Sequence, residues 1–517
     1  MPSHFETEMR EPRENSEIGA TSASAPAAFS VSGYANGHAP ASVPLAVDLD
    51  GTLFRTDLLL ESLLRLVKQK PWLLALVPFW LIRGRAFLKQ RMFEAITLEY
   101  TSLPVVQPFL DWLHGEKAQG RRLLLVTAAN EELAVRSVAH LELFDVVIGS
   151  DENRNLKGSE KATVLQDMFG SEFAYAGNSR VDFAVWKLSK EVIVVNAGAG
   201  VKAQAKQLGK DTKVFEQPGN TLASLVRSLR PYQWVKNLLI FVPAFTSHAG
   251  VRWPILLQSL IAFVAFSLCA SATYIVNDLL DLEEDRAHTS KKFRPFASGE
   301  LSINLGLSVA AVCFLAGMGI AFLSGPALPP LLFLYILIAA AYSMQIKRVL
   351  LLDVLTLAIL YTMRVIAGHV VTGIPFSVWL LSFAFFLFLS LAFCKRATEL
   401  FKLNKKPATR NDAVIPGRGY RSEDLQIIST AGLSSGFLSS LVFALYINSE
   451  SVTLLYRHPA VLWGILPLLL YYILRIWIVC GRGELDDDPI LYTAKSPSTY
   501  AIAMLVVILV IAATINY

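Results

Sequence analysis

The sequence predicts a protein of two parts, an α/β Rossmann-like domain followed by an all-α membrane domain of about nine transmembrane helices. Between residues 44 and 216, short apolar stretches of strand length alternate with helical stretches, which is the pattern of a doubly wound sheet. Long uncharged runs occur almost only after residue 230. The 517-residue chain is 53% hydrophobic with a mean hydropathy of +0.45, which is high for a soluble protein. We therefore expect a soluble N-terminal part and a polytopic membrane part.

Composition narrows the possible partners. The net charge of +5 is mild, and the basic residues gather in particular loops rather than along one helix face, so nucleic acid is not an expected partner. The four cysteines lie in apolar segments without metal or disulfide spacing, and we expect them to be small buried hydrophobic residues. Residues 1–43 have no apolar periodicity and lack the apolar core of a signal peptide, so a disordered cytoplasmic tail is predicted.

The first chemical motif follows the first predicted strand. The mainly apolar stretch Pro44–Leu49 overlaps the motif Asp48-Leu49-Asp50-Gly51-Thr52. In such a pair the first carboxylate can attack a phosphoryl group, the second can protonate the leaving oxygen, and both can help to hold Mg²⁺, while Gly51 permits a sharp turn. Further strands are predicted over residues 121–128, 173–176 and 191–196. A doubly wound domain has its site at the carboxyl ends of its strands, where these motifs would meet.

Four segments in chain order resemble the haloacid-dehalogenase (HAD) superfamily of phosphohydrolases over about residues 44–216. They are the Asp48–Asp50 motif, Thr127 at a strand end, the Lys157/Lys161 pair, and the loop Gly177–Asp182. The resemblance implies catalytic roles for Asp48 as nucleophile and Asp50 as acid/base, places Thr127 and Lys161 on the transferred phosphoryl group, and assigns the metal to Asp48, Asp50 and Asp182. The chain has Asn178 where the family usually has an aspartate. An amide is a weaker, uncharged ligand, so an active phosphatase and a degraded or regulatory domain both stay open.

Residues 54–102, between the first two motifs, are predicted to form a helical cap. Its apolar run Trp72–Ile82 is too short to span a bilayer and is followed by Arg83 and Arg85. This run could touch a membrane surface, but packing inside the cap is the favoured interpretation. Residues 217–229 are predicted to be a linker, because Pro218, Gly219 and Asn220 break regular structure there.

The membrane domain is predicted over residues 230–517. Its candidate spans are 234–251, 253–276, 303–323, 328–346, 349–372, 374–394, 425–447, 459–480 and 498–517, each near the roughly 20 apolar residues that a bilayer requires. One alternate set of loops is rich in Lys and Arg, whereas the other carries only Arg252 and Arg457. The positive-inside rule then places the N-terminal domain in the cytoplasm and the C-terminus on the opposite side of the cytoplasmic membrane.

An acidic cluster follows the second span, in the segment Asn277–Asp285. If the helix continues, Asn277, Asp281 and Asp285 recur at i, i+4 and i+8, and Asp278 lies beside them. Crowded carboxylates repel one another unless a cation lies among them, and such oxygen ligands suit Mg²⁺ bridged to a diphosphate. The alternative is an ordinary solvated helix end.

The acidic spacing N-D-x-x-D-x-x-x-D, the R-P-x-A-S-G of Arg294–Gly299 and about nine spans resemble the UbiA superfamily of intramembrane prenyltransferases over about residues 230–517. Members with aromatic acceptors carry a second aspartate-rich motif after the sixth span, where this chain has Lys395 and Arg396. Cations there should bind a second anionic group rather than a second Mg²⁺. Together with the segment Arg230–Asn237, and with Tyr342 and Lys347, this departure resembles the decaprenyl-phosphate phosphoribosyltransferase branch.

That resemblance implies transfer of 5-phosphoribose from phosphoribosyl diphosphate to a polyprenyl phosphate within membrane lipids. Asp278, Asp281 and Asp285 would hold the Mg²⁺ of the leaving diphosphate, and Lys395, Arg396 and Lys347 would bind the two other phosphates, the first two as catalytic residues. The further substrate-binding candidates are Arg230, Lys236, Asn277, Lys291, Arg294, Tyr342 and Arg364. Two alternatives stay open, prenyl transfer to an aromatic acceptor such as 4-hydroxybenzoate and a transporter with a regulatory domain.

Three further features belong to the membrane domain. Asp353 and Arg364 lie eleven residues apart, which places them on one helix face, and an ionisable residue at this depth is a functional candidate. His369 is expected at the membrane interface. The run Asp486–Asp488 is expected to be a solvated loop that could close over the site.

Overall fold

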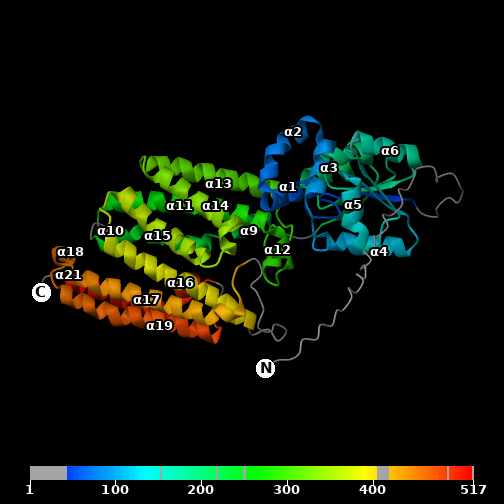
Figure 1. The fold of residues 1–517 in the computed structure, drawn as a ribbon. Helices are drawn as coiled ribbons and strands as arrows, with labels where there is room; N and C mark the ends of the chain where they lie inside the picture. Colours follow the sequence, from blue (N-terminus) through cyan, green and yellow to red (C-terminus); the bar gives the residue numbers. More distant parts are fainter. Residues whose placement is uncertain are drawn as a thin grey trace, which may run out of the picture. The chain divides into compact units, whose positions relative to one another are not determined.

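The computed structural model describes residues 43–151, 154–216, 219–247, 252–404, 418–485 and 488–514. The predicted tail lies outside these residues except for Val43, and so do Pro218 of the predicted linker and Asp486 and Asp487. The described residues belong to one unit that contains both the parallel sheet and the membrane helices. Figure 1 gives the course of the chain from the sheet to the helices.

The N-terminal part is built on six parallel strands in the order β3-β2-β1-β4-β5-β6. They are β1 (Leu45–Val47), β2 (Leu123–Asn130), β3 (Val146–Ser150), β4 (Ala174–Gly177), β5 (Glu191–Val195) and β6 (Asp211–Phe215). The chain adds β2 and β3 on one side of β1 and then β4 to β6 on the other, so the order reverses at β1. Four of these strands match the predicted ones, and β3 and β6 are additional. The predicted parallel α/β sheet is confirmed.

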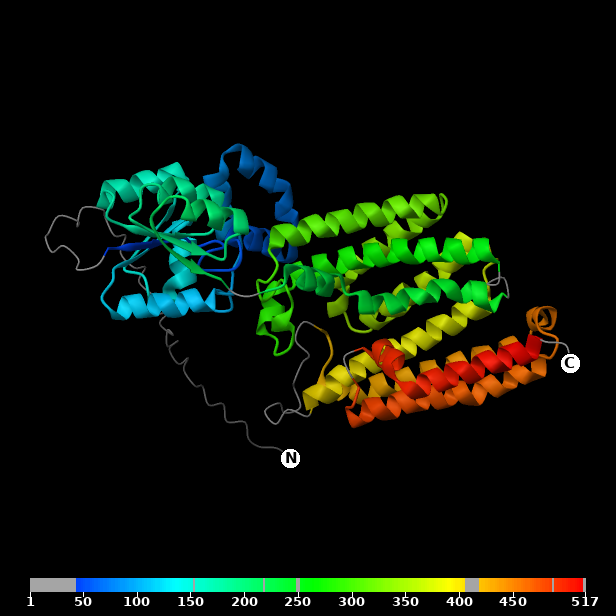
Figure 2. The same cartoon turned by 180° about the vertical axis from the view of Figure 1, so that it is seen from behind.

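Helices cover both faces of this sheet (Figure 2). From α4 onward, the helices of this part are α4 (Gln107–Ala118), α5 (Glu131–Val138), α6 (Ser159–Phe169), α7 (Phe183–Trp186) and α8 (Ala199–Lys206). Side chains alternate along β1, so Leu45 and Val47 pack with Phe109 and Leu113 of α4, whereas Ala46 packs in a second core with Trp186 of α7. Strands buried on both faces explain the continuous apolar runs in the sequence.

A helical segment links β1 to α4, as predicted. It contains α1 (Leu58–Gln69), a 3₁₀ helix (Pro71–Leu76), α2 (Val77–Ile82) and α3 (Arg85–Ala95). The expectation that the apolar run packs inside this segment is wrong, because no residue between Pro71 and Ile82 is buried. Trp72 and Ile82 are 67% and 82% exposed.

The second part is helical, and its long helices lie side by side in both ribbon views (Figures 1 and 2). Seven helices are long and apolar enough to cross a membrane among the described residues, at Trp253–Leu280, Ile303–Leu323, Leu352–Thr372, Val378–Leu403, Ser422–Ile447, Pro459–Arg482 and Pro497–Thr514. The corresponding elements are α11 (Trp253–Leu280), α13 (Ile303–Leu323), α15 (Leu352–Thr372), α16 (Val378–Asn404), α17 (Leu425–Ile447), α19 (Ile465–Arg482) and α21 (Pro497–Thr514).

Two of the expected spans have a different form. Residues 328–344 form a shorter apolar helix, α14 (Leu328–Met344), and the first expected span contains an 11-residue 3₁₀ helix (Pro231–Phe241) followed by α10 (Val242–Thr246). Pro231 and Pro243 lack the N–H that a continuous α-helix needs, which explains this break. The count of nine spans thus stays a prediction, whereas seven are supported.

Short elements connect these helices. They are α9 (Thr221–Leu229), α12 (Leu282–Ala287), α18 (Glu450–Leu455), α20 (Pro489–Lys495) and 3₁₀ turns at Lys291–Phe293 and Ile346–Arg348. The described part of the predicted linker is therefore mostly helix α9, whose Leu225 and Leu229 pack against the core formed by α11 and α13. All four cysteines are buried and free, as expected.

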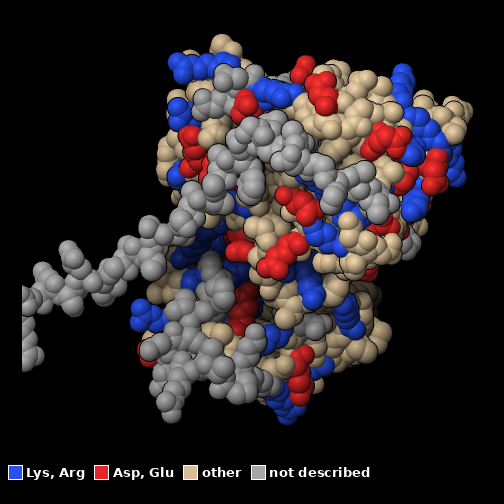
Figure 3. Space-filling view, turned by 90° about the vertical axis from the view of Figure 1, so that its right-hand side faces the viewer, with Lys and Arg blue, Asp and Glu red and all other residues tan. Residues whose placement is uncertain are grey.

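Charges of both signs are intermixed on the molecular surface. Figure 3 shows Lys and Arg side chains beside Asp and Glu side chains over the visible face. This mixing agrees with the mild net charge of +5.

Candidate functional sites

The acidic motif lies where α11 ends and α12 begins. Helix α11 ends at Leu280, and Asp281 has the non-helical ψ of 17°. The Asp281 N–H still donates to the Asn277 carbonyl at 2.9 Å, and the Asp285 N–H donates to the Asp281 carbonyl at 2.8 Å, so the expected spacing of these three residues continues across the junction. Their side chains differ in partner, because Asp278 and Asp285 point to one cation and Asp281 points to others.

Arg294 joins Asp278 and Asp285. Its Nη1 atom lies 3.0 Å from Asp278 Oδ1 and 2.7 Å from Asp285 Oδ2. Arg230 also donates a hydrogen bond to Asp278, whose side chain is almost fully buried. Burial raises the pKa of Asp285 to about 6, although Arg294 opposes this shift. The two carboxylates are thus directed at one position that a cation now fills.

Asp281 lies between two lysines from distant segments. Lys347, on the 3₁₀ turn after α14, is 3.1 Å from Asp281 Oδ2, and Lys68 of α1 is 2.7 Å from Asp281 Oδ1. Burial opposes the ionisation of Asp281, but Lys347 and Lys68 outweigh it and lower the pKa of that carboxyl below its usual value. Asp281 is therefore ionised, and two lysines balance its charge.

Helix α1 contributes more than Lys68 to this region. Glu61 forms a two-pronged ion pair with Arg286, at 2.6 and 2.9 Å, and both side chains are only 6% exposed. Arg65 lies 2.6 Å from Glu283 of α12. The first helix of the N-terminal part is thus fixed by charges to the acidic motif of the membrane part.

Two of the three aspartates are placed as Mg²⁺ ligands require. Among the residues that the structure describes, no group of three or more His, Cys, Asp or Glu side chains is arranged to hold a metal ion. Mg²⁺ commonly takes one or two carboxylates and completes its shell with water and substrate phosphates. Asp278 and Asp285 meet that requirement, because both lie within hydrogen-bonding distance of a single nitrogen of Arg294. Asp281 does not converge with them.

The second candidate site lies at the carboxyl ends of β1 and β4. Lys161 donates hydrogen bonds to Asp48 Oδ1 at 2.7 Å and to the Tyr175 hydroxyl at 2.9 Å. Burial raises the pKa of Asp48, although Lys161 opposes it. Burial, with a smaller contribution from Asp57, raises the pKa of Asp50 to about 7. Asp50 can therefore hold a proton near neutral pH, which a general acid requires.

Asp182 and Thr127 are also brought to this edge of the sheet. The Tyr175 hydroxyl donates to Asp182 Oδ1 at 3.0 Å, and Oδ2 accepts the N–H groups of Asn178 and Ser179 at 3.1 and 2.8 Å. These bonds use both oxygens of Asp182, so this carboxylate holds the loop together. Thr127 is buried, and its hydroxyl accepts the N–H of Ala129.

A glycine permits the close approach of Asn178 to the first motif. Gly51 has a φ of +75°, and a Cβ atom there would lie 2.0 Å from Asn178 Nδ2. Only a glycine allows this contact without a shift. Asn178, which replaces the usual aspartate, thus lies directly against the Asp48–Asp50 turn.

Known proteins were compared with the chain. Residues 238–479 match the model of the UbiA prenyltransferase family. The uncharacterized protein y4nM of Sinorhizobium fredii is 36% identical over 468 residues, which cover 90% of both chains. Residues 238–479 form a domain of the UbiA prenyltransferase family. A decaprenyl-phosphate phosphoribosyltransferase of Mycobacterium tuberculosis is 37% identical over 191 residues, covering 36% of this chain and 63% of that relative.

Among solved structures, a UbiA homolog from Archaeoglobus fulgidus bound to GPP and Mg²⁺ aligns with a TM-score of 0.43 and 17% identity. The alignment covers 56% of this chain and 99% of that one. Family membership and the seven apolar helices together identify this chain as an integral membrane protein.

Arg396 was expected to be an accessible cation after the sixth span, but it is not accessible. This side chain is fully buried in α16, and its guanidinium binds Asp353, Glu399 and the Tyr342 hydroxyl. Two carboxylates and the Tyr342 hydroxyl surround this cation, and the expected phosphate contact of Arg396 and substrate contact of Tyr342 stay predictions. We infer that Arg396 positions α15 against α16.

Lys395 is partly exposed and borders a small cavity. Leu357, Tyr361 and Asp488 line the same space. Asp488, expected in a solvated loop, is instead largely buried and paired with Lys236. Burial opposes its ionisation, but Lys236 and Lys395 lower the pKa of Asp488. Asp488 therefore closes this part of the site, with Lys236 as its partner.

Arg364 lies in a buried polar cluster of its own. Its Nε atom donates to Asn237 at 2.8 Å, and its Nη2 atom donates to the Tyr335 hydroxyl at 2.8 Å. The guanidinium also lies 4.9 Å from the centre of the Tyr335 ring. The expected face shared with Asp353 does not bring the two side chains into one network, because Asp353 binds Arg396. His369 is buried in the last turn of α15, and its place at the membrane interface stays a prediction.

The other candidates lie near the acidic motif. Asn277 is half-buried beside Asp278, and Lys291 is half-buried in the 3₁₀ turn before Arg294. Burial, assisted by Arg294, lowers the pKa of Lys291. Sequence reasoning missed Lys68, Asn237 and Tyr335. The only signal for Lys68 was that Glu61, Arg65 and Lys68 share one face of α1 at i, i+4 and i+7.

Proposed function

We propose that this protein transfers 5-phosphoribose from phosphoribosyl diphosphate to a polyprenyl phosphate at the junction of α11 and α12. The observation that carries the proposal is the charge arrangement around Asp278, Asp285 and Arg294. Two carboxylates converge on one cation, and Arg230 lies beside them. Such a set can exchange an internal ion pair for a metal and a diphosphate. The 37% identity to a decaprenyl-phosphate phosphoribosyltransferase supports this choice of substrates.

In this proposal Asp278 and Asp285 would hold Mg²⁺, which neutralises charge on the leaving diphosphate. Arg294 and Arg230, released from the carboxylates, would bind diphosphate oxygens. The bond between C1 of the ribose and the diphosphate oxygen breaks, and a bond forms from C1 to a phosphate oxygen of the lipid. The bonding electrons leave with the diphosphate. No proton has to move, because the acceptor is already an anion.

Other cations of the site take the remaining phosphates. Lys347 and Lys68, which now neutralise Asp281, flank the donor side, and Lys395 is the candidate for the lipid phosphate. We place this site and the N-terminal domain on the cytoplasmic side, since the basic loops are on the same side as the acidic motif.

A transfer assay in membranes tests this proposal. Labelled phosphoribosyl diphosphate with polyprenyl phosphate is compared with labelled prenyl diphosphate with 4-hydroxybenzoate, using the wild type, Asp278→Asn and the exposed control Glu423→Gln. Label that enters the lipid fraction only from the first pair, and is lost only in Asp278→Asn, is the expected result. Label that moves only in the second pair would keep the family and overturn the phosphoribosyl proposal.

We also propose that the α/β site removes the 5-phosphate from the lipid-linked product. The specific support is the pair of Asp48, which Lys161 orients, and Asp50, whose raised pKa of about 7 suits an acid. Asp48 would attack phosphorus, and the ribose 5-oxygen would leave with the proton of Asp50. Water would then cleave the aspartyl phosphate to release inorganic phosphate. This site is also the one that resembles the HAD superfamily.

The two activities can be tested in one full-length protein. Phosphate release from the purified phosphoribosyl lipid should be lost in Asp48→Asn and retained in Asp278→Asn. Phosphoribosyl transfer should show the reverse dependence. Phosphate release that persists in Asp48→Asn would refute the assignment of the α/β site and leave the transferase proposal intact.

A further inference from the structure

The segment from Pro71 to Ile82 exposes an unusual amount of apolar surface. Trp72, Phe79 and Ile82 are 67%, 65% and 82% exposed, and Leu74, Leu76 and Leu81 are exposed as well. Apart from the indole nitrogens, its side chains hold no hydrogen-bonding group. An exposed patch of this kind on a folded domain indicates contact with a partner or a membrane.

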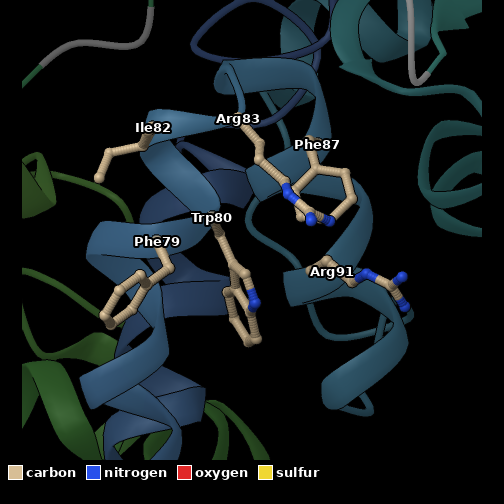
Figure 4. A pocket seen from close by; sticks show the side chains of 6 residues that line it. All are labelled: Phe79, Trp80, Ile82, Arg83, Phe87 and Arg91. Atoms are coloured by element: carbon tan, nitrogen blue, oxygen red, sulfur yellow. The ribbon is translucent and has the colours of Figure 1, made fainter.

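Cations border this apolar segment. Arg83 follows it directly, and Arg91 of α3 lies across a pocket of about 560 Å³ that Phe79, Trp80, Ile82 and Phe87 also line. Both guanidinium groups lie over the Phe87 ring, at 5.3 and 5.2 Å from its centre. Figure 4 shows Trp80 between α2 and α3, and Arg83 pointing toward Phe87 of α3.

The position of the segment in the chain favours a bilayer as the partner. Lys68, at the end of α1, binds Asp281 at the end of a membrane helix, and the apolar segment starts three residues later. The segment is therefore tethered within a few residues of the membrane domain. With 12 residues, Pro71–Ile82 is too short to span a bilayer but long enough to lie in its interface.

We propose that Pro71–Ile82 is an interfacial membrane-binding element of the α/β domain. Trp72, Phe79 and Ile82 enter the acyl-chain boundary, and Arg83 with Arg91 binds the phosphate of an anionic phospholipid. The proposal is independent of the chemistry proposed above. It implies that the α/β site is held at the surface where a lipid-linked substrate is available.

Spin labels on the full-length protein test the insertion. Because all four native cysteines are buried, a label can be placed at Ile82→Cys and, as a control on exposed α8, at Gln204→Cys. The proteins are reconstituted in vesicles of phosphatidylcholine with phosphatidylglycerol. We expect collisions with a water-soluble nickel chelate to be at least about fivefold rarer at position 82, with oxygen collisions enhanced.

Two results would overturn the proposal. One is equal nickel accessibility at positions 82 and 204. The other is spin–spin broadening at position 82 that disappears when labelled protein is diluted with unlabelled protein, because this would identify a second copy of the chain as the occupant. A thermal unfolding curve for each variant shows whether the labelled protein is folded.

The headgroup contact is tested with a charge variant. In Arg83→Gln/Arg91→Gln, the label at position 82 should lose its dependence on phosphatidylglycerol, whereas Lys206→Gln, an exposed residue on α8, should retain it. Unchanged dependence in the double variant would exclude these arginines as the lipid-phosphate site. Since transferase activity is not the readout, its loss or retention does not affect the result.

Discussion

The two candidate sites use carboxylates in opposite ways. At the junction of α11 and α12, the three aspartates of the motif are each paired with Arg or Lys, and Asp281 is paired with two lysines. In the α/β domain, Asp48 has Lys161, whereas Asp50 accepts a backbone N–H from Leu58 and has a pKa of about 7. Side-chain cations hold the acids of the first site, and these cations can be exchanged for other ions. In the second site, Asp50 can carry a proton near neutral pH.

The largest effect should come from removing the proposed nucleophile. Asp48→Asn should reduce phosphate release by at least about 10⁴-fold, because an amide cannot form the covalent intermediate. Phosphoribosyl transfer by the same protein should be unchanged. Assays of both reactions, with exposed Asp167→Asn as the matched control, check this. Equal loss of both activities would show that the two sites do not act separately.

A smaller loss is expected from Asp278→Asn. The change leaves Arg230 and Arg294 with less negative charge and removes one of the two converging carboxylates, so transfer should fall by about 10²–10³-fold. Phosphate release should persist. The Mg²⁺ concentration needed for half-maximal transfer should rise, which separates lost metal binding from misfolding. A variant with wild-type transfer would remove Asp278 from the site.

The ion pair between Glu61 and Arg286 should couple the two halves of the protein. Breaking a buried pair from one side leaves an unpaired charge. The losses of unfolding free energy in Glu61→Gln and in Arg286→Gln should therefore add up to more than the loss in the double variant. We expect a coupling free energy of about 1–3 kcal/mol. Thermal or denaturant unfolding in detergent measures it. A coupling near zero would mean that α1 is not held by this pair.

The pH dependence gives the smallest but most direct contrast. Asp50 must be protonated to donate, and its pKa is about 7, so phosphate release should fall about tenfold per pH unit as the pH rises above that value. Transfer needs no proton donor and should be nearly flat from pH 7 to 9. Rates measured across this range test both statements. A hydrolysis rate that stays constant to pH 9 would contradict the role of Asp50 as the acid.

Local sequence patterns were sufficient for four of the six strands and for most helices. The apolar run before Asp48 becomes β1 because its side chains are buried on both faces, and seven long apolar runs become the membrane helices. The residues that end β1 and β4 could be placed together, because parallel strands share a carboxyl edge. These predictions depend on the periodicity within single segments and on the order of the segments along the chain.

Pairings between distant segments could not be predicted. Lys68 and Asp281 are separated by 213 positions, and the register of α1 against α12 is set by packing that no local pattern encodes. Arg396 looked like an accessible cation after a span, but Asp353 and Glu399 enclose it. Sequence reasoning therefore found the acidic motif but not its counterions.

The buried cluster around Arg364 bears on how the protein enters the membrane. Placing an arginine at the centre of an inserting helix costs about 2.5–3.5 kcal/mol. Its partners Asn237 and Tyr335 both precede it in the chain, so both are synthesised before Arg364. The earlier helices can thus receive the guanidinium as α15 arrives. Insertion of α15 is expected to depend on the order of synthesis, and a circularly permuted chain that makes α15 first should insert it poorly.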